Sequence, residues 1–374
     1  MRVLFVVGGL PFGGIENLLF DVSKEFLKRG IPFKVVNLSG TGQKEEEFRE
    51  AGIPVVDLGS SLKDIKTFKL KTAGKLKKLI EEERADVVHS MQFPADYFTR
   101  VALLTDRRVK VITHIHTTKR ERRFERRVFN RLLSARTDAF LSVSEAVYRA
   151  VEKEHNIFGK PHYVMYNGIN FLRLAERAKE KVDLNINIKD KKLFIVVGRL
   201  VPMKRVDLAI RALSIISRKH QEAALLIVGE GKERKKLEKL AEELSIKNRV
   251  IFTGYRKNVA PYLFNSYALL MPSEYEGFPV THIEAAFFGL PAIISPFVPS
   301  KEVFARSSLI APLSAEEIAK RMELLLTDNR TYRRLSEAAS QEASRYSIEA
   351  YADALLDLYE GLTRGKLPEK RVLF

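Results

Sequence analysis

The feature that most constrains the fold is a regular alternation of short apolar runs with longer amphipathic segments. In the first half of the chain the apolar runs are Val3–Val7, Phe33–Leu38, Val55–Leu58, Val87–His89, Val109–Thr113, Ala139–Ser142 and Tyr163–Tyr166. Between them, segments such as Ile15–Arg29, Lys71–Glu83 and Ser144–Glu154 space their apolar residues as helices do. Apolar runs of this kind are typical of parallel strands buried on both faces of a sheet. The alternation therefore predicts a doubly wound α/β domain.

The alternation fades between Phe171 and Asp190 and then begins again. The second series of apolar runs is Leu193–Val197, Ala224–Val228, Val250–Phe252, Ala268–Met271 and Ala292–Ser295. Helices are expected at Asp207–Lys219, Lys232–Leu244, Thr281–Phe288, Asn329–Arg345 and Ile348–Thr363. A chain of 374 residues is long enough for two domains, which we expect at 1–175 and 190–346. Ligands of such sheets bind beyond the carboxyl ends of the strands, so a cleft between the two domains is the expected active site.

Composition narrows the class of function. Lys and Arg number 64 against 47 Asp and Glu, which gives a net charge of +17 and favours partners that carry phosphate. The chain has no Cys, which excludes a disulfide framework, thiolate metal sites and a Cys nucleophile. The apolar stretch at the N-terminus is too short for a signal peptide, and no run approaches the roughly 18 to 20 residues of a membrane span. We therefore expect a cytoplasmic protein.

A glycine-rich segment, Gly8–Glu16, follows the first apolar run and leads into a helix. Free backbone N–H groups at such a helix start can bind a phosphate. A dinucleotide site is disfavoured, because the second strand ends near Asn37 rather than at an acidic residue. A plain tight turn remains an alternative.

Two cations follow the first strand of the second series. Arg199 can hold phosphate oxygens with two parallel hydrogen bonds, and Lys204 adds a compact positive charge. The pair suits a leaving diphosphate. The alternative is a solvated loop that precedes a helix capped by Asp207.

The densest cluster of polar residues is Pro272–Ala286. Glu276 lies in a turn and Glu284 in the first turn of the following helix, so both can face a ligand site at the end of the strand. A carboxylate is a natural acceptor for the paired hydroxyls of a ribose, and a second can hold a sugar ring. Thr281 and Glu284 also fit a capping box, which explains Glu284 equally well.

Several segments occur in an order and spacing that resemble the glycogen-synthase-like family of retaining glycosyltransferases. These segments are Gly13–Glu16, Tyr166–Asn170, Gly198–Lys204, Val228–Gly231, Phe252–Tyr255, Glu276–Pro279 and Glu284–Ala286. The resemblance covers nearly the whole chain. It implies the GT-B fold of family 4 type, with two Rossmann-like domains facing each other across a cleft. The C-terminal helix, about residues 347–374, is expected to pack back on the N-terminal, acceptor-side domain.

The resemblance also implies a reaction and its residues. Arg199 and Lys204 would hold the diphosphate of a UDP- or GDP-sugar, Glu284 the ribose and Glu276 the sugar. The expected donor-binding residues are Gly13, Gly14, Gly229, Gly254, Tyr255, Gly277, Phe278, Pro279 and Glu284. Retention by front-face attack makes Glu276 a sugar-positioning group rather than a covalent nucleophile. There is no Asp-x-Asp motif, so neither a metal nor another cofactor is expected; cations and aligned amides can neutralise the departing diphosphate.

The histidines depart from the family pattern. Relatives often carry His-x-His after the fourth strand, but here Met91 follows His89 at the second of these positions. His114 and His116, after the next strand, offer substitutes. We expect His116 to be a catalytic group that faces the sugar or acceptor, with His89, Met91 and His114 on the same side. Ordinary loop histidines are the alternative.

The segment Lys119–Arg136 predicts a basic amphipathic helix. It could dock on the inner face of the cell membrane, which would suit a lipid-linked or glycan acceptor in polysaccharide or lipopolysaccharide synthesis. The alternative is a helix that packs its apolar stripe on its own sheet.

Two other functions remain open: a nucleotide-sugar epimerase of the same fold and a non-enzymatic nucleic-acid binder. The second is disfavoured because no groove-reading or base-stacking signature is present, so we expect no nucleic-acid partner.

Overall fold

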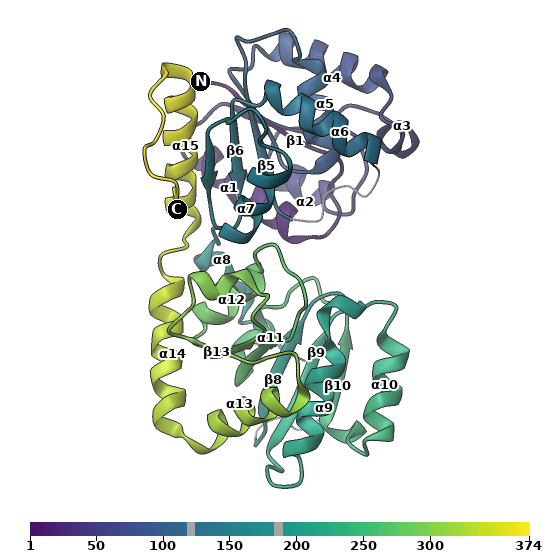
Figure 1. Cartoon of the computed structure of the whole chain (residues 1–374), viewed down its shortest axis with the longest axis vertical. Coiled ribbons are helices and arrows are strands. Elements are labelled where there is room, and N and C mark those ends of the chain that lie inside the picture. The colour runs from purple at the N-terminus through teal and green to yellow at the C-terminus, as the bar shows by residue number, and fades with distance from the viewer. Residues whose placement is uncertain (118–123, 183–189) are drawn as a thin grey trace. The chain divides into compact units, whose positions relative to one another are not determined.

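The computed structural model describes residues 1–117, 124–182 and 190–374, which form two compact units (Figure 1). The first unit contains Met1–Gly168 and Ile348–Phe374, and the second contains Ile169–Ser347. Each is built on one parallel sheet with helices on both faces. The predicted fold class, two doubly wound Rossmann-like domains with C-terminal helices, is confirmed.

The sheet of the first unit has seven strands in the order β3-β2-β1-β4-β5-β6-β7 among the described residues. The strands are β1 (Val3–Val7), β2 (Phe33–Asn37), β3 (Val55–Asp57), β4 (Val87–Ser90), β5 (Lys110–Ile115), β6 (Ala139–Ser142) and β7 (His162–Val164). The helices are α1 (Gly14–Lys28), α2 (Glu45–Glu50), α3 (Leu62–Lys66), α4 (Leu70–Glu83), α5 (Phe93–Ala102), α6 (Phe124–Leu133), α7 (Glu145–Glu154) and α15 (Ile348–Arg364), with a 3₁₀ turn η1 (Ser134–Arg136).

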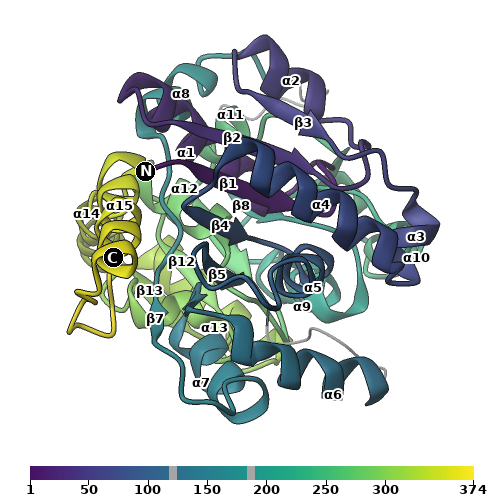
Figure 2. The ribbon, with the colours of Figure 1, turned by 90° about the horizontal axis from the view of Figure 1, so that it is seen from above.

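Alternate residues of the central strand β1 face opposite layers of this unit. Phe5 packs in the cluster that contains α1 and α15, whereas Leu4 packs in the cluster that contains α4 and α5. Figure 2 shows α4 and α5 beside the strands of the sheet. Because both faces are covered, the strands consist almost wholly of apolar residues, which is the pattern that the sequence displays.

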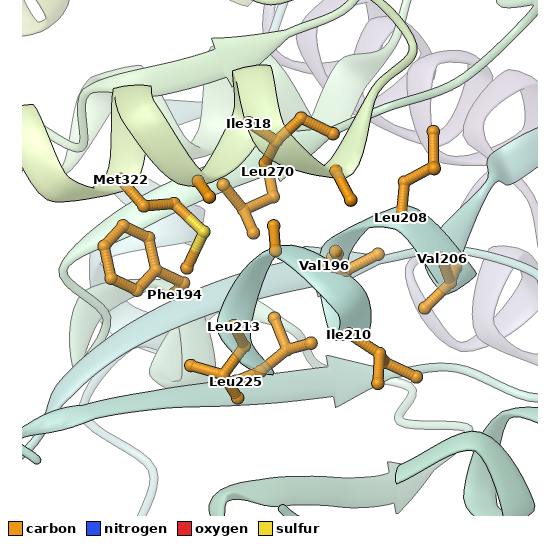
Figure 3. Close-up of a cluster of buried hydrophobic side chains, with 14 of the residues drawn as sticks. Phe194, Val196, Val206, Leu208, Ile210, Leu213, Leu225, Leu270, Ile318 and Met322 are labelled. Carbon is orange, nitrogen blue, oxygen red and sulfur yellow. The ribbon is translucent and has the colours of Figure 1, made fainter. Parts of the chain in front are cut away.

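The sheet of the second unit has six strands in the order β10-β9-β8-β11-β12-β13 among the described residues. The strands are β8 (Lys192–Val197), β9 (Ala223–Val228), β10 (Val250–Gly254), β11 (Ala268–Met271), β12 (Ala292–Ile294) and β13 (Ser308–Ile310). The helices are α8 (Phe171–Arg177), α9 (Val206–Ile216), α10 (Arg234–Glu243), α11 (Ala260–Phe264), α12 (Val280–Phe287), α13 (Ala315–Thr327) and α14 (Asn329–Ala343), with 3₁₀ turns η2 (Pro202–Lys204), η3 (Lys247–Arg249) and η4 (Pro299–Glu302). Figure 3 shows the core in which Phe194 of β8 and Leu213 of α9 pack with Met322 of α13.

The segment expected to be a linker begins with a helix. In α8 the ring of Phe171 stacks on Phe287 at 4.7 Å, and Arg177 donates a hydrogen bond of 2.9 Å to the carbonyl oxygen of Lys257. These contacts attach residues from 169 onward to the second unit, so the first unit ends at Gly168 rather than at 175. Residues 183–189 of this segment lie outside the described residues.

Two helix starts differ from the sequence interpretation. Helix α9 begins at Val206 after Arg205, whose backbone is left-handed with φ 48°, so Asp207 lies in the first turn and is not the cap. Helix α12 begins after Pro279 without a side-chain cap, so Thr281 and Glu284 do not form a capping box. Glu284 is therefore not explained by helix capping.

Candidate functional site

The carboxyl ends of β8, β9 and β10 are joined by backbone hydrogen bonds in the second unit. Gly198 N–H donates to the carbonyl oxygen of Val228 at 3.0 Å, and Gly229 N–H donates to that of Gly254 at 2.9 Å. A Cβ at Gly229 would lie 1.9 Å from the carbonyl oxygen of Gly198, and its φ is +152°, so only glycine fits there. Gly229 and Gly254, two of the expected donor-binding residues, thus connect the segments that follow β9 and β10. Their predicted role in donor binding stays a prediction.

Lys204, at the end of η2, forms an ion pair with Oε1 of Glu276, which lies in the segment after β11. Ser273 donates a hydrogen bond of 2.9 Å to the same oxygen. The Lys204 side chain is 20% exposed and that of Glu276 is 11% exposed, so both charges are largely removed from water. Two residues that sequence reasoning selected, 72 positions apart, therefore meet.

A small cavity of about 10 Å³ lies beside this pair and is lined by Gly198, Arg199, Lys204, Ser273 and Glu276, among others. Arg199 is exposed, and its side chain has no ion pair or hydrogen bond within the part of the chain that the structure describes. One free guanidinium, one paired ammonium and one carboxylate thus lie together at the carboxyl ends of β8 and β11. This arrangement can neutralise a diphosphate and hold a sugar hydroxyl.

The other predicted donor-binding residues of this unit do not line the small cavity. Glu284 is partly buried on α12 and is not among the residues that line the cavity. Phe278 and Pro279 are buried, Gly277 is partly exposed, and Tyr255 is 53% exposed. Their predicted roles stay predictions. Ser273 was missed, because a serine in a Pro-Ser-Glu turn carries no signal of its own.

A larger cavity of about 550 Å³ lies between α9 and α10. Its lining includes Arg205, which contacts Glu274 at 3.0 Å, and neither Lys204 nor Glu276 lines it. Because its charges of both signs are mostly paired with each other, it offers less to a polyanionic ligand than the cluster at Lys204.

In the first unit the glycine-rich segment is held by side chains. Gly8 N–H donates to Oε1 of Gln92 at 2.8 Å, and Gln92 Nε2 donates to Oε1 of Glu16 at 2.6 Å. Glu16 is 4% exposed, and burial raises the pKa of its carboxyl, against the lowering effects of its own backbone N–H, of Lys44 and of Gln92. A buried carboxyl group therefore lies beside Gly13, at the helix start where a phosphate is expected. The predicted role of Gly13 and Gly14 stays a prediction.

The three histidines lie at the carboxyl ends of β4 and β5. His89 Nε2 lies 3.2 Å from His114 Nδ1, and the rings of His114 and His116 are 4.1 Å apart. Burial lowers the pKa of His89 and of His116 to about 3, and that of His114 well below its usual range, so all three are neutral near pH 7. His89 and His114 are buried, and His116 alone is partly exposed.

Two further residues of the first unit, Met91 and Tyr359, bear on these histidines. Met91 is 2% exposed and packs in the hydrophobic core of the first unit. Its predicted place on the acceptor or sugar side stays a prediction. Tyr359 of α15 lies with its hydroxyl oxygen 2.5 Å from His89 Nδ1. Sequence reasoning missed Tyr359, because two partners that are 270 positions apart leave no local pattern.

No group of three or more potential metal ligands is present among the described residues. Over the same residues, no helix is long and apolar enough to cross a membrane. The basic segment Lys119–Arg136 is described only in part, since residues 118–123 lie outside the described residues.

Comparison with known proteins identifies the family. Residues 12–172 match the family described as Glycosyltransferase Family 4, and residues 177–342 match Glycosyl transferases group 1. The capsular polysaccharide biosynthesis glycosyltransferase CapH of Staphylococcus aureus is 26% identical over 318 residues, which cover 81% of this chain and 83% of CapH. The poly(glycerol-phosphate) alpha-glucosyltransferase of Bacillus subtilis is 27% identical over 174 residues, which cover 44% of this chain and 26% of that protein. The first four curated relatives are matched over only 26% to 48% of their own length.

Among solved structures, HepE of Anabaena in complex with UDP shares the fold with a TM-score of 0.82 at 18% identity, over 96% of this chain and all of HepE. The same protein is also known in complex with UDP-glucose. Taken together, the two family matches and the shared fold show that this chain is a glycosyltransferase of the family 4 type with the GT-B fold.

Proposed function

We propose that this protein is a retaining glycosyltransferase that moves a sugar from a UDP- or GDP-sugar to a glycan or a lipid-linked glycan. The observation that carries the proposal is the cluster of Arg199, Lys204 and Glu276 at the carboxyl ends of β8 and β11. In the proposed reaction the two cations hold the diphosphate, and Glu276 holds the sugar. The complexes of HepE with UDP and UDP-glucose support a UDP-sugar as the donor. The similarity to CapH, a capsular polysaccharide biosynthesis glycosyltransferase, supports a polysaccharide of the cell envelope as the product.

The surroundings of Glu276 support retention by front-face attack rather than through a covalent intermediate. One oxygen of Glu276 already accepts from both Lys204 and Ser273, which lowers its nucleophilicity and suits it to orient a hydroxyl. The acceptor hydroxyl would then lose its proton to the departing phosphate while Arg199 and Lys204 stabilise the growing charge. The alpha linkage in the name of the Bacillus subtilis relative agrees with retention from an α-linked donor.

In the second unit, Glu284 is proposed to contact the ribose, and the N–H groups of Gly277 and Phe278 the sugar. In the first unit, His116 is proposed to face the sugar or the acceptor. Glu284→Ala is expected to weaken nucleotide binding measured by calorimetry, and unchanged affinity would remove it from the ribose site. Neither metal nor cofactor is proposed for the reaction.

A nucleotide-sugar panel tests the function. Thermal stabilisation and hydrolysis of each UDP- and GDP-sugar should identify the donor, because a ligand that binds the native state raises the melting temperature. Product made with the identified donor and an acceptor is expected to keep the anomeric configuration, read by ¹H NMR. An inverted product would refute retention. Turnover of the donor without any acceptor, with a new sugar epimer appearing, would favour the epimerase alternative.

We further propose that α6 makes peripheral contact with an anionic membrane. Among its described residues, Val128 (38%), Phe129 (59%) and Leu132 (56%) have exposed apolar side chains. The cations Arg127 and Arg131 are exposed beside them. Apolar side chains flanked by cations are suited to the boundary of an anionic bilayer.

Flotation with phosphatidylglycerol vesicles tests this contact. Replacement of Phe129 and Leu132 by Ser should weaken binding by roughly tenfold per side chain, since burial of each contributes about 1.5 kcal/mol. Leu172→Ser, at a leucine that is 76% exposed on α8, is the matched control. Equal binding by all three proteins, or no binding by the wild type, would overturn the proposal.

A further inference from the structure

A chain of three buried polar side chains links the C-terminal helix to the strand ends of the first unit. Tyr359 and His89 are 0% exposed and His114 is 1% exposed. Tyr359 Oη lies 2.5 Å from His89 Nδ1, and His89 Nε2 lies 3.2 Å from His114 Nδ1. Each neighbour is within hydrogen-bond distance of the next, so the proton positions along the chain depend on one another.

Each of the two histidines carries one N–H, because both rings are neutral. Only two arrangements then keep both hydrogen bonds. In the first, Tyr359 donates to His89 Nδ1, and His89 Nε2–H donates to His114 Nδ1. In the second, His114 Nδ1–H donates to His89 Nε2, and His89 Nδ1–H donates to the Tyr359 oxygen.

The two arrangements differ in the groups that they leave unsatisfied. Tyr359 Oη has no second partner among the described residues, and His114 Nε2 is buried without a partner there. The first arrangement leaves one donor unsatisfied, the Nε2–H of His114. The second leaves both the Tyr359 hydroxyl hydrogen and the His114 Nε2 lone pair unsatisfied. A buried polar group without a partner is costly, so the first arrangement is the more stable.

We propose that Tyr359 is a positioning residue, whose hydroxyl donates to His89 Nδ1 and so holds His89 and His114 as Nε2–H tautomers. The ring of His116 lies against that of His114, with 4.1 Å between the ring centres and 36° between the ring planes, so its orientation depends on the same chain. The effect on catalysis rests on the proposed function, in which His116 faces the sugar or acceptor. The tautomers themselves do not depend on it.

The tautomers can be read directly by ¹H–¹⁵N long-range NMR of the ¹⁵N-histidine-labelled full chain, which has seven histidines. Protonated and unprotonated ring nitrogens resonate in separate regions, and His89→Gln and His114→Gln variants assign the signals. We expect Nε2 to be protonated in both His89 and His114. A proton on Nδ1 of either residue would overturn the inference, whether or not a donor sugar has been found.

Tyr359→Phe removes only the hydroxyl group. It is expected to shift the His89 signals toward a mixture of tautomers and to lower kcat about tenfold, with nucleotide affinity changed by less than about twofold. Tyr351→Phe is the matched control: Tyr351 is also fully buried on α15, but its hydroxyl has no hydrogen-bond partner in the described part of the chain. Unchanged His89 signals in Tyr359→Phe would refute the positioning role. Shifted signals with unchanged kcat would confine that role to structure and refute its catalytic part.

Discussion

Replacing Glu276 by Gln is expected to change nucleotide binding and sugar transfer in opposite directions. The Lys204 ammonium is paired with Glu276, so a diphosphate must compete with that carboxylate for it. Glutamine keeps the size and the hydrogen bond from Ser273 but removes the negative charge. UDP or GDP, whichever binds the wild type, should therefore bind more tightly to Glu276→Gln, while transfer from the nucleotide-sugar should slow.

The exposed fractions of the two side chains set the size of the effect. With 20% and 11% of the side chains exposed, the pair lies between a surface ion pair, worth at most about 1 kcal/mol, and a buried charge-assisted bond of about 1.5 to 3 kcal/mol. The amide oxygen of the introduced glutamine still accepts from Lys204, so only part of this competition is relieved. We expect about 1.4 kcal/mol, which is a tenfold decrease of Kd.

Isothermal titration calorimetry with the nucleotide measures this change, and Glu274→Gln is the matched control. Glu274 lies in the same turn and contacts Arg205 at 3.0 Å, but its side chain is 49% exposed, so its loss should alter Kd by less than about twofold. An unchanged or weaker affinity in Glu276→Gln would show that the ion pair does not compete with the diphosphate. Tighter binding of the nucleotide together with faster transfer would refute the role of Glu276 on the sugar.

Three further outcomes are expected. In Gly229→Ala the new Cβ would meet the Gly198 carbonyl oxygen, so the free energy of unfolding, measured with urea, should fall by about 3 kcal/mol or more. Gly30→Ala is the control, because no atom lies near a Cβ at that position, and it should cost only about 1 kcal/mol. Burial lowers the pKa of His282 to about 3, so protons bind the unfolded chain more readily, and the free energy of unfolding should fall as the pH drops from 6.5 toward 3. In His282→Gln, the decrease of that free energy between pH 7 and pH 5 should be smaller by about 2 kcal/mol. The same pH profile in both proteins would contradict this. Activity should survive EDTA, whereas loss that Mg²⁺ restores would refute metal-independent neutralisation of the diphosphate.

The sequence alone determined the fold class and most of the elements of this protein. Apolar runs and helical spacing are local properties of the chain, and the burial of both faces of a parallel sheet enforces them. The same logic identified the segments that follow β8 and β11, because the carboxyl ends of parallel strands gather ligand-facing loops. Arg199, Lys204 and Glu276 were selected for this reason, and they line one cavity.

Only the tertiary structure decided which of these groups touch. The ion pair between Lys204 and Glu276, and the bond from Tyr359 to His89, join residues that are far apart in the chain, so no spacing rule could reveal them. The capping-box alternative for Glu284 failed for a related reason: the helix starts at Val280, where the turn after β11 places it, and not at the residue with the best capping side chain. Local preference yields to packing wherever the ends of an element are set by the sheet beside it.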